Sequence, residues 1–208
     1  KWKLFKIFSL LIAFIVGIST LFYTIPSESV GIVLRFGQYS STTEPGLHLK
    51  VPFFIDQVVK VPVRRQLKQE FGFGTAGATN YYQSSSPNTQ EAEKSMVTGD
   101  SNVALVEWVV QYKIKDPKEY LFQVRNPDET LRDTSESIMR EVVGDRTVDE
   151  VITFGRQEIE VEAKTKLQSL VNKYEMGIGI DLIQLKSVNA PREVQASFNE
   201  VESAKQEL

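Results

Sequence analysis

An uncharged run of twenty residues, 7–26, directly follows three lysines at the start of the chain. A helix rises about 1.5 Å per residue, so roughly twenty apolar residues cross the ~30 Å hydrocarbon core of a bilayer. Because lysines favour the cytoplasmic side, the positive-inside rule keeps the N-terminus inside and exports the remaining chain. The sequence therefore predicts an N-terminal tail and transmembrane helix over residues 1–26.

A cleaved signal peptide is the alternative interpretation of this run, since it also combines a short basic region with an apolar core. No A-x-A-like cleavage site follows the run, and the small residues Gly17 and Ser19 lie inside it. A retained membrane anchor is the favoured interpretation.

Composition excludes several classes of function. The chain has no cysteine and one histidine, His48, which excludes disulfides, thiolate metal sites and histidine-rich metal clusters. A net charge of -3 gives no reason to expect nucleic acid as a partner. His48 lies in an extended run, where a hydrogen-bonded structural role is favoured over a general base, and no motif singles out a catalytic serine or lysine. We therefore expect no enzyme activity, no cofactor and no metal.

Alternating apolar and polar residues predict extended structure in the first half of the chain. We expect a strand over residues 27–39, a turn over 40–46, and two extended runs over 47–52 and 57–65. The next segment, 71–95, is rich in small and polar residues, which predicts a surface loop. Its four aromatic residues would suit packing against a neighbour, but a tolerated insertion is the favoured interpretation.

The second half of the chain predicts one long strand, two or three helices and a further strand. Val103–Ile114 alternates most clearly and is expected to be half-buried. A helix is predicted from Pro127 to Gly144. A capping box at 147–150 starts the next helix, which Gly155 is expected to break or kink. Residues 178–188 alternate again as a strand.

A polar helix is predicted from Pro191 to the last residue of the chain. Its apolar residues recur at spacings of four, three and seven, which gives two apolar positions per heptad and predicts a helix that supercoils with a partner. These inter-subunit stalk candidates are Val194, Phe198, Val201 and Leu208. A short helix packed on its own domain is the alternative.

The order of these elements predicts the α+β fold class. We expect a tail and transmembrane helix over 1–26, a first subdomain over 27–115 and a second subdomain over 116–190. The start of a coiled-coil helix is expected over 191–208.

Several segments resemble the band 7 or SPFH family, which comprises stomatins, prohibitins, flotillins and the HflK/HflC proteins. They are GIVLRFGQY at 31–39, EPGLHLKVPF at 44–53, TGDSN at 98–102 and PREV at 191–194. Residues 116–132 resemble the HflK branch. The resemblance implies a head of mostly antiparallel strands plus helices, followed by the start of a coiled coil.

For function, the resemblance implies a membrane-anchored scaffold that assembles with an HflC-type paralogue and further HflK copies into a ring or cage. Such an assembly modulates the FtsH-type AAA+ membrane protease by controlling substrate access. The implied location is the bacterial inner membrane, with a single span and the head on the periplasmic face. A membrane microdomain organiser without a protease partner is an alternative, and a membrane-anchored serine protease is another.

Phe53, Phe54 and Ile55 are candidate membrane-contact residues. They follow Pro52 at an expected turn, close after the anchor, and aromatic rings favour the membrane interface. They would serve equally well to fill the core of the head, so both interpretations stay open.

Overall fold

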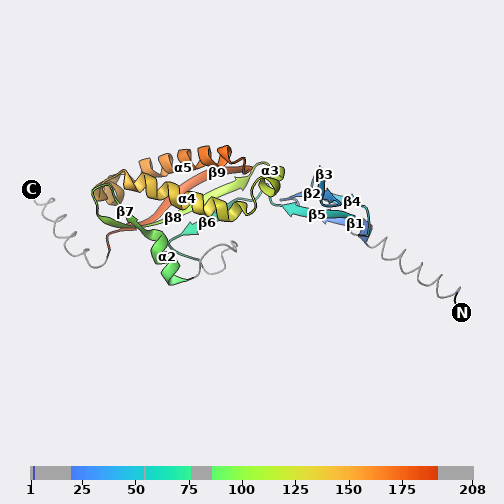
Figure 1. The fold of residues 1–208 in the computed structure, drawn as a ribbon, viewed down its shortest axis with the longest axis horizontal. Coiled ribbons are helices and arrows are strands. Elements are labelled where there is room, and N and C mark those ends of the chain that lie inside the picture. Colours follow the sequence, from blue (N-terminus) through green and yellow to red (C-terminus); the bar gives the residue numbers. More distant parts are fainter. Residues whose placement is uncertain (1, 3–19, 54, 76–85, 192–208) are drawn as a thin grey trace, which may run out of the picture. The chain divides into compact units, whose positions relative to one another are not determined.

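A computed structural model describes Trp2 and residues 20–53, 55–75 and 86–191 of the chain. The chain divides into two compact units (Figure 1). Unit 1 comprises Lys1–Arg65 and Ile114–Lys118, and unit 2 comprises Gln66–Lys113 and Glu119–Leu208. The subdomain boundary expected after residue 115 does not separate these units, because the strand that follows Arg65 pairs with the strand 103–114.

Unit 1 contains two small antiparallel sheets. Strands β1 (Phe22–Ile25) and β4 (Gly46–Leu49) form a two-stranded ribbon. Strands β3 (Gln38–Thr43), β2 (Val30–Arg35) and β5 (Asp56–Val61) form a three-stranded sheet in that order. Both extended runs expected after residue 46 contain a strand.

The ribbon packs on the three-stranded sheet through Ile25. This side chain is 4% exposed, and it lies so close to Gly31 of β2 that a Cβ atom at position 31 would overlap its terminal methyl group. Glycine at position 31 therefore permits the contact. Ile32 and Val33 of β2 and Val61 of β5 are also buried.

The strand expected over 27–39 is in fact a hairpin of β2 and β3. Phe36 (φ 51°) and Gly37 (φ 81°) adopt left-handed backbone conformations that reverse the chain between the two strands. The turn expected over 40–46 is shorter than predicted, because β3 continues to Thr43 and β4 begins at Gly46.

The transmembrane helix predicted over residues 1–26 cannot extend to residue 26. Residues 3–19, which contain most of it, lie outside the described residues. Phe22–Ile25 is a strand rather than a helix, because each of its residues pairs with β4. A helix through this run therefore has to end by Leu21. Within the ranges that the structure describes, no helix is long and apolar enough to cross a bilayer.

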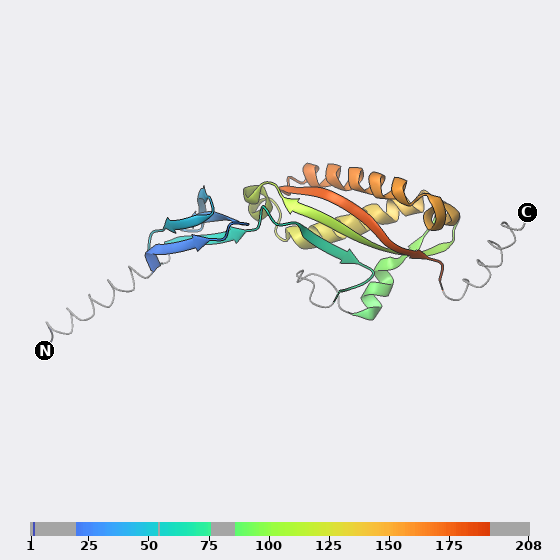
Figure 2. The same cartoon turned by 180° about the vertical axis from the view of Figure 1, so that it is seen from behind.

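Unit 2 has a helix layer and a four-stranded sheet. Strands β6 (Leu67–Phe71), β7 (Ser95–Val97) and β9 (Ile178–Asn189) all pair with β8 (Val103–Ile114). The short helix α3 (Pro117–Phe122) follows β8. Figures 1 and 2 show α4 (Pro127–Gly144) and α5 (Arg156–Lys173) on one side of β8 and β9. The long strand, the helix over 127–144 and the last strand are confirmed.

The core of unit 2 is centred on Trp108. Its side chain is fully buried, its ring stacks on Phe71 at 4.5 Å between centroids, and its indole N–H donates to Ser135 Oγ at 3.2 Å. Leu131 and Met139 of α4 are fully buried in the same cluster. The apolar face of β8 is thus covered by α4, as the alternation of β8 predicted.

The junction between α4 and α5 contains the expected capping box. Thr147 N donates to Glu150 Oε2 (2.8 Å), and Glu150 N donates to Thr147 Oγ1 (3.4 Å). The following turn is a π-helix, η1 (Glu150–Phe154), and α5 starts after Gly155. A Cβ atom at Gly155 would lie 2.7 Å from the Glu150 carbonyl oxygen, so this tight break requires glycine.

The segment expected to be a loop over 71–95 is partly regular structure. Phe71 belongs to β6, and helix α2 (Pro87–Lys94) leads directly into β7. Tertiary contacts impose this structure: Arg132 Nη2 pairs with Glu93 Oε1 at 2.5 Å, and Arg140 donates to the Ala92 and Ser95 carbonyl oxygens. Tyr81 and Tyr82 lie outside the described residues.

Candidate membrane-contact site

One face of the β1–β4 ribbon carries exposed apolar side chains. Phe22 pairs with Leu49 across the ribbon, and Leu47 lies two residues further along the same face. Phe22 is 51% exposed, Leu47 is 67% exposed and Leu49 is 65% exposed. The opposite face carries Ile25, which is buried. The face of the ribbon that carries Phe22, Leu47 and Leu49 is therefore the one exposed at the surface of unit 1.

One strand of this apolar face, β1, lies inside the uncharged run 7–26, near its C-terminal end. Phe22 is the third residue of the range that begins at Thr20, and the Lys50 backbone N–H donates to the Leu21 carbonyl oxygen at 2.8 Å. That hydrogen bond places the end of β4 beside Leu21 of the run. Three exposed large apolar residues on one face of a small ribbon make this face a candidate contact surface.

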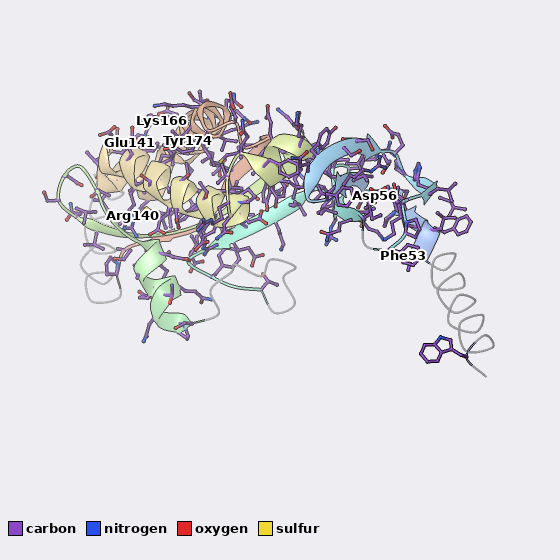
Figure 3. All side chains as sticks on the ribbon, turned by 45° about the vertical axis from the view of Figure 1, so that its right-hand side comes forward. Phe53, Asp56, Arg140, Glu141, Lys166 and Tyr174 are labelled. Carbon is purple, nitrogen blue, oxygen red and sulfur yellow. The ribbon has the colours of Figure 1, made fainter. Side chains whose placement is uncertain are left out.

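The turn after β4 carries Phe53, which is 57% exposed and has a left-handed backbone (φ 60°). Figure 3 shows Phe53 at the end of unit 1 where β1 begins, with Asp56 further into the unit. Asp56 holds this turn in place: its carboxylate accepts from the Val51 N–H (2.9 Å) and from Arg35 Nε (2.8 Å). Phe53 thus lies between Val51 and Asp56, which this hydrogen bond joins.

An ion pair between Arg35 and Asp56 stabilises the turn that carries Phe53. Arg35 donates through both Nε and Nη2 to the two carboxylate oxygens of Asp56, which is 3% exposed. The Arg35 side chain, followed by the Val51 backbone N–H, holds the pKa of Asp56 below its ordinary value. The carboxylate stays ionised at neutral pH and keeps both partners.

The predicted site residues fall in different places. Phe53 is exposed, Ile55 is half-buried at the end of the same turn, and Phe54 lies outside the described residues. Contact of these residues with lipid stays a prediction. The stalk candidates Val194, Phe198, Val201 and Leu208 also lie outside the described residues.

The ribbon residues Phe22, Leu47 and Leu49 were missed as site candidates. The signal was present, because Leu47 and Leu49 alternate with His48, but alternation alone does not tell which face is buried. His48 has a hydrogen-bonded structural position, with Nε2 2.7 Å from the Glu44 carbonyl oxygen and its ring 5.6 Å from Tyr23. In the part of the chain that the structure covers, no three His, Asp or Glu side chains form a metal-binding group.

The described fold is of the α+β class, with a small β unit that carries an exposed apolar ribbon and a second unit in which helices pack on a sheet. Residues 23–208 match the SPFH domain / Band 7 family, and the chain belongs to this family. The predicted fold of antiparallel strands plus helices is thereby confirmed.

Relatives with known names include the HflK proteins of several bacteria. "Protein HflK" of Treponema pallidum is 38% identical over 196 residues, which cover 93% of this chain and 59% of the relative. "Protein HflK" of Borreliella burgdorferi is 32% identical over 202 residues, covering 97% and 63%. "Modulator of FtsH protease HflK" of Escherichia coli K12 is 34% identical over 185 residues, covering 89% and 39%. The predicted resemblance to the HflK branch is confirmed, and the chain spans less than two thirds of the length of each of these relatives.

Proposed function

We propose that this chain is the membrane-anchored head of an HflK-type scaffold that modulates an FtsH-type membrane protease. The observation that carries the membrane part is the exposed apolar face of the β1–β4 ribbon, whose strand β1 lies at the C-terminal end of the uncharged run. The protease part rests on similarity to the Escherichia coli relative, whose name describes a modulator of FtsH protease. No reactive residue is needed for either part, and the proposed scaffold is not an enzyme.

The proposed anchor is a single helix that ends by Leu21, with the N-terminus in the cytoplasm and both units on the periplasmic side of the inner membrane. The three lysines at positions 1, 3 and 6 support this orientation. Because β1 begins at Phe22, the ribbon lies at the level of the headgroups. Its exposed face and Phe53 then contact the outer leaflet.

In the proposed assembly, neighbouring chains associate with an HflC-type paralogue and further copies into a ring. The helix that starts near Pro191 contributes Val194, Phe198, Val201 and Leu208 to a seam between chains. In a single helix the apolar seam would be exposed to water, and association of helices buries it between chains. Restriction of all copies to the membrane plane multiplies weak pairwise contacts through effective concentration.

Co-purification of the full chain tests the partner proposal. The chain is extracted in mild detergent from its own bacterium, and the captured proteins are identified by mass spectrometry with the mass of the intact complex. Capture of an FtsH-type protease and an HflC-type paralogue supports the proposal. A complex of copies without a protease supports a microdomain organiser instead, and a solitary monomer rules out both.

The membrane contact needs a separate test. The chain has no cysteine, so Leu49→Cys and Val161→Cys each give a single labelling site. Val161 is a matched control, because it is 61% exposed but lies on α5 of unit 2. In nanodiscs, a fluorophore at position 49 should be quenched by nitroxides on lipid chains, and one at position 161 by aqueous iodide. Equal aqueous quenching at both positions would remove the proposed contact.

A further inference from the structure

Two exposed phenylalanines of unit 1 share an unusual backbone conformation. Phe36 (φ 51°) is 79% exposed and Phe53 (φ 60°) is 57% exposed. A bulky residue rarely adopts positive φ, and strained positions of this kind collect at functional sites. Glycine would occupy either turn without strain, so the phenyl rings are present at a conformational cost. That cost points to a contact made by the rings outside unit 1.

The two turns are joined by hydrogen bonds. The Phe36 backbone N–H donates to the Ile55 carbonyl oxygen at 3.0 Å, which links the β2–β3 turn to the turn that carries Phe53. Arg35, the residue before Phe36, pairs with Asp56 across β2 and β5 and also bonds to its carboxylate. The same carboxylate accepts from Val51 N–H at the start of the Phe53 turn. The Asp56 carboxylate therefore connects the two turns through its hydrogen bonds to Arg35 and Val51.

The surroundings indicate lipid as the partner of these rings. The turn that carries Phe53 follows Lys50, whose N–H bonds to the carbonyl oxygen of Leu21, a residue of the uncharged run just before β1. The exposed apolar face of the ribbon continues from the same strand. Aromatic rings favour the boundary between headgroups and acyl chains, where a rigid ring contacts both.

We propose that Phe36 and Phe53 enter the outer leaflet together as a fixed pair, and that Asp56 is the positioning residue that holds the pair. This inference rests on the membrane contact proposed above and adds Phe36 and Asp56 to it. Phe36 lies on a different turn from the candidates predicted from the sequence. The hydrogen bond from its N–H to the Ile55 carbonyl oxygen connects it to the turn that carries Phe53.

Site-directed spin labelling of the full chain in liposomes tests the pair. Nitroxides are attached singly to Phe36→Cys, Phe53→Cys, Leu49→Cys and Thr165→Cys, and Thr165 on exposed α5 serves as the aqueous control. Collision with oxygen relative to an aqueous nickel complex reports depth. The labels at 36, 49 and 53 should all show higher ratios than the label at 165. Lipid contact at 49 and 53 with an aqueous label at 36 overturns the pair but leaves the proposed contact standing, and aqueous labels at all positions overturn both.

The positioning role of Asp56 is tested with the labels at 49 and 53. In Asp56→Asn the carboxylate charge that holds Arg35 and Val51 is lost, so the label at 53 should become shallower and more mobile while the label at 49 keeps its depth. Glu44→Gln is the matched control, since the Glu44 carboxylate is exposed and pairs with Arg64 at 3.9 Å in the same unit. An unchanged label at 53, or equal loss of depth at 49 and 53 with a lower melting temperature, overturns the positioning role.

Discussion

The two units differ in the balance between their buried and their exposed apolar residues. Unit 2 buries a continuous cluster of 24 apolar residues. Unit 1 buries five, which are Ile25, Ile32, Val33, Val61 and Ile114, and in its described range it exposes six large ones besides Trp2, which are Phe22, Phe36, Tyr39, Leu47, Leu49 and Phe53. The described part of unit 2 is about twice as long and exposes seven, which are Val97, Val103, Phe122, Phe154, Val161, Tyr174 and Leu182. Since burial of apolar surface supplies most of the stabilisation of a fold, unit 2 is self-sufficient in water. Unit 1 has the smaller core relative to its exposed apolar residues, which agrees with the proposed membrane contact.

Charge separates the units in the same sense. The described residues of unit 1 include seven basic and four acidic side chains, whereas those of unit 2 include twelve basic and nineteen acidic ones. Basic residues near a membrane are attracted to anionic headgroups, and an excess of acidic residues is repelled. The contrast therefore favours unit 1 over unit 2 as the part that contacts lipid.

The largest expected effect is in the core of unit 2. Trp108→Ala removes a fully buried ring that stacks on Phe71 and donates to Ser135, so unfolding should become easier by about 3–5 kcal/mol. Urea unfolding of the detergent-solubilised chain, followed by circular dichroism, measures this change. Trp2→Ala is the control, because Trp2 is 77% exposed. Similar midpoints for the two variants would contradict a self-sufficient core in unit 2.

The buried ion pair of unit 2 gives the next largest effect. Arg132→Met leaves the Glu93 carboxylate buried without its charge partner and should destabilise unit 2 by about 3 kcal/mol. The double variant Arg132→Met with Glu93→Leu should recover much of that loss, because no unpaired charge remains. Arg64→Met, which breaks an exposed pair of unit 1, is the control. If the double variant is no more stable than Arg132→Met, charge burial is not the cause.

Sequence patterns predicted unit 2 better than unit 1, for a physical reason. The strand Val103–Ile114 and the helix Pro127–Gly144 each bury one face against the core, so the periodicity of their residues repeats over many positions. In unit 1 the strands are four to six residues long, and the hairpin turn at Phe36 lies inside an alternating run. Helix α2 was also missed, because Arg132 and Arg140 hold it from some forty residues away.

The candidate site was predictable only in part. Phe53 stood out because three apolar residues follow a proline at a turn. Leu47 and Leu49 needed the register of β1 with β4, and Phe36 needed its hydrogen bond to Ile55. Asp56 carries no local signal, since its role comes from partners 5 and 21 residues away.

The apolar face of the ribbon can be removed without loss of the fold. Leu47→Ser with Leu49→Ser should leave unfolding within roughly 0.5 kcal/mol, because both side chains are exposed. Contact with lipid should weaken by about 2 kcal/mol, and quenching of a fluorophore at Phe22→Cys by lipid-chain nitroxides should fall accordingly. Phe154→Ser with Val161→Ser removes equally exposed apolar residues from unit 2 and should leave this quenching unchanged. Equal loss in both pairs would erase the distinction between the units.

The smallest expected effect is on the stability of the fold at acid pH. It depends on the hydrogen-bonded carboxylate of Asp100 in unit 2. The Thr98 hydroxyl, with support from the Asn102 amide and the Val148 N–H, holds the pKa of Asp100 below its ordinary value. A lowered folded-state pKa means that the carboxylate stabilises the fold above its unfolded-state pKa of about 3.9, and that this stabilisation is lost as pH falls through the folded-state value.

Asp100→Asn should therefore melt at a lower temperature than the parent chain at pH 7, and the difference should shrink as pH falls below about 4. Melting curves from pH 7 to pH 2 measure it, with Asp133→Asn on the exposed side of α4 as control. Asp56 of unit 1 is tied in the same way, but its expected readout is the depth of Phe53 in lipid rather than melting of unit 2. A melting difference for Asp100→Asn that stays constant across this pH range would mean that the charge of Asp100 contributes nothing, and that its geometry alone holds the loop.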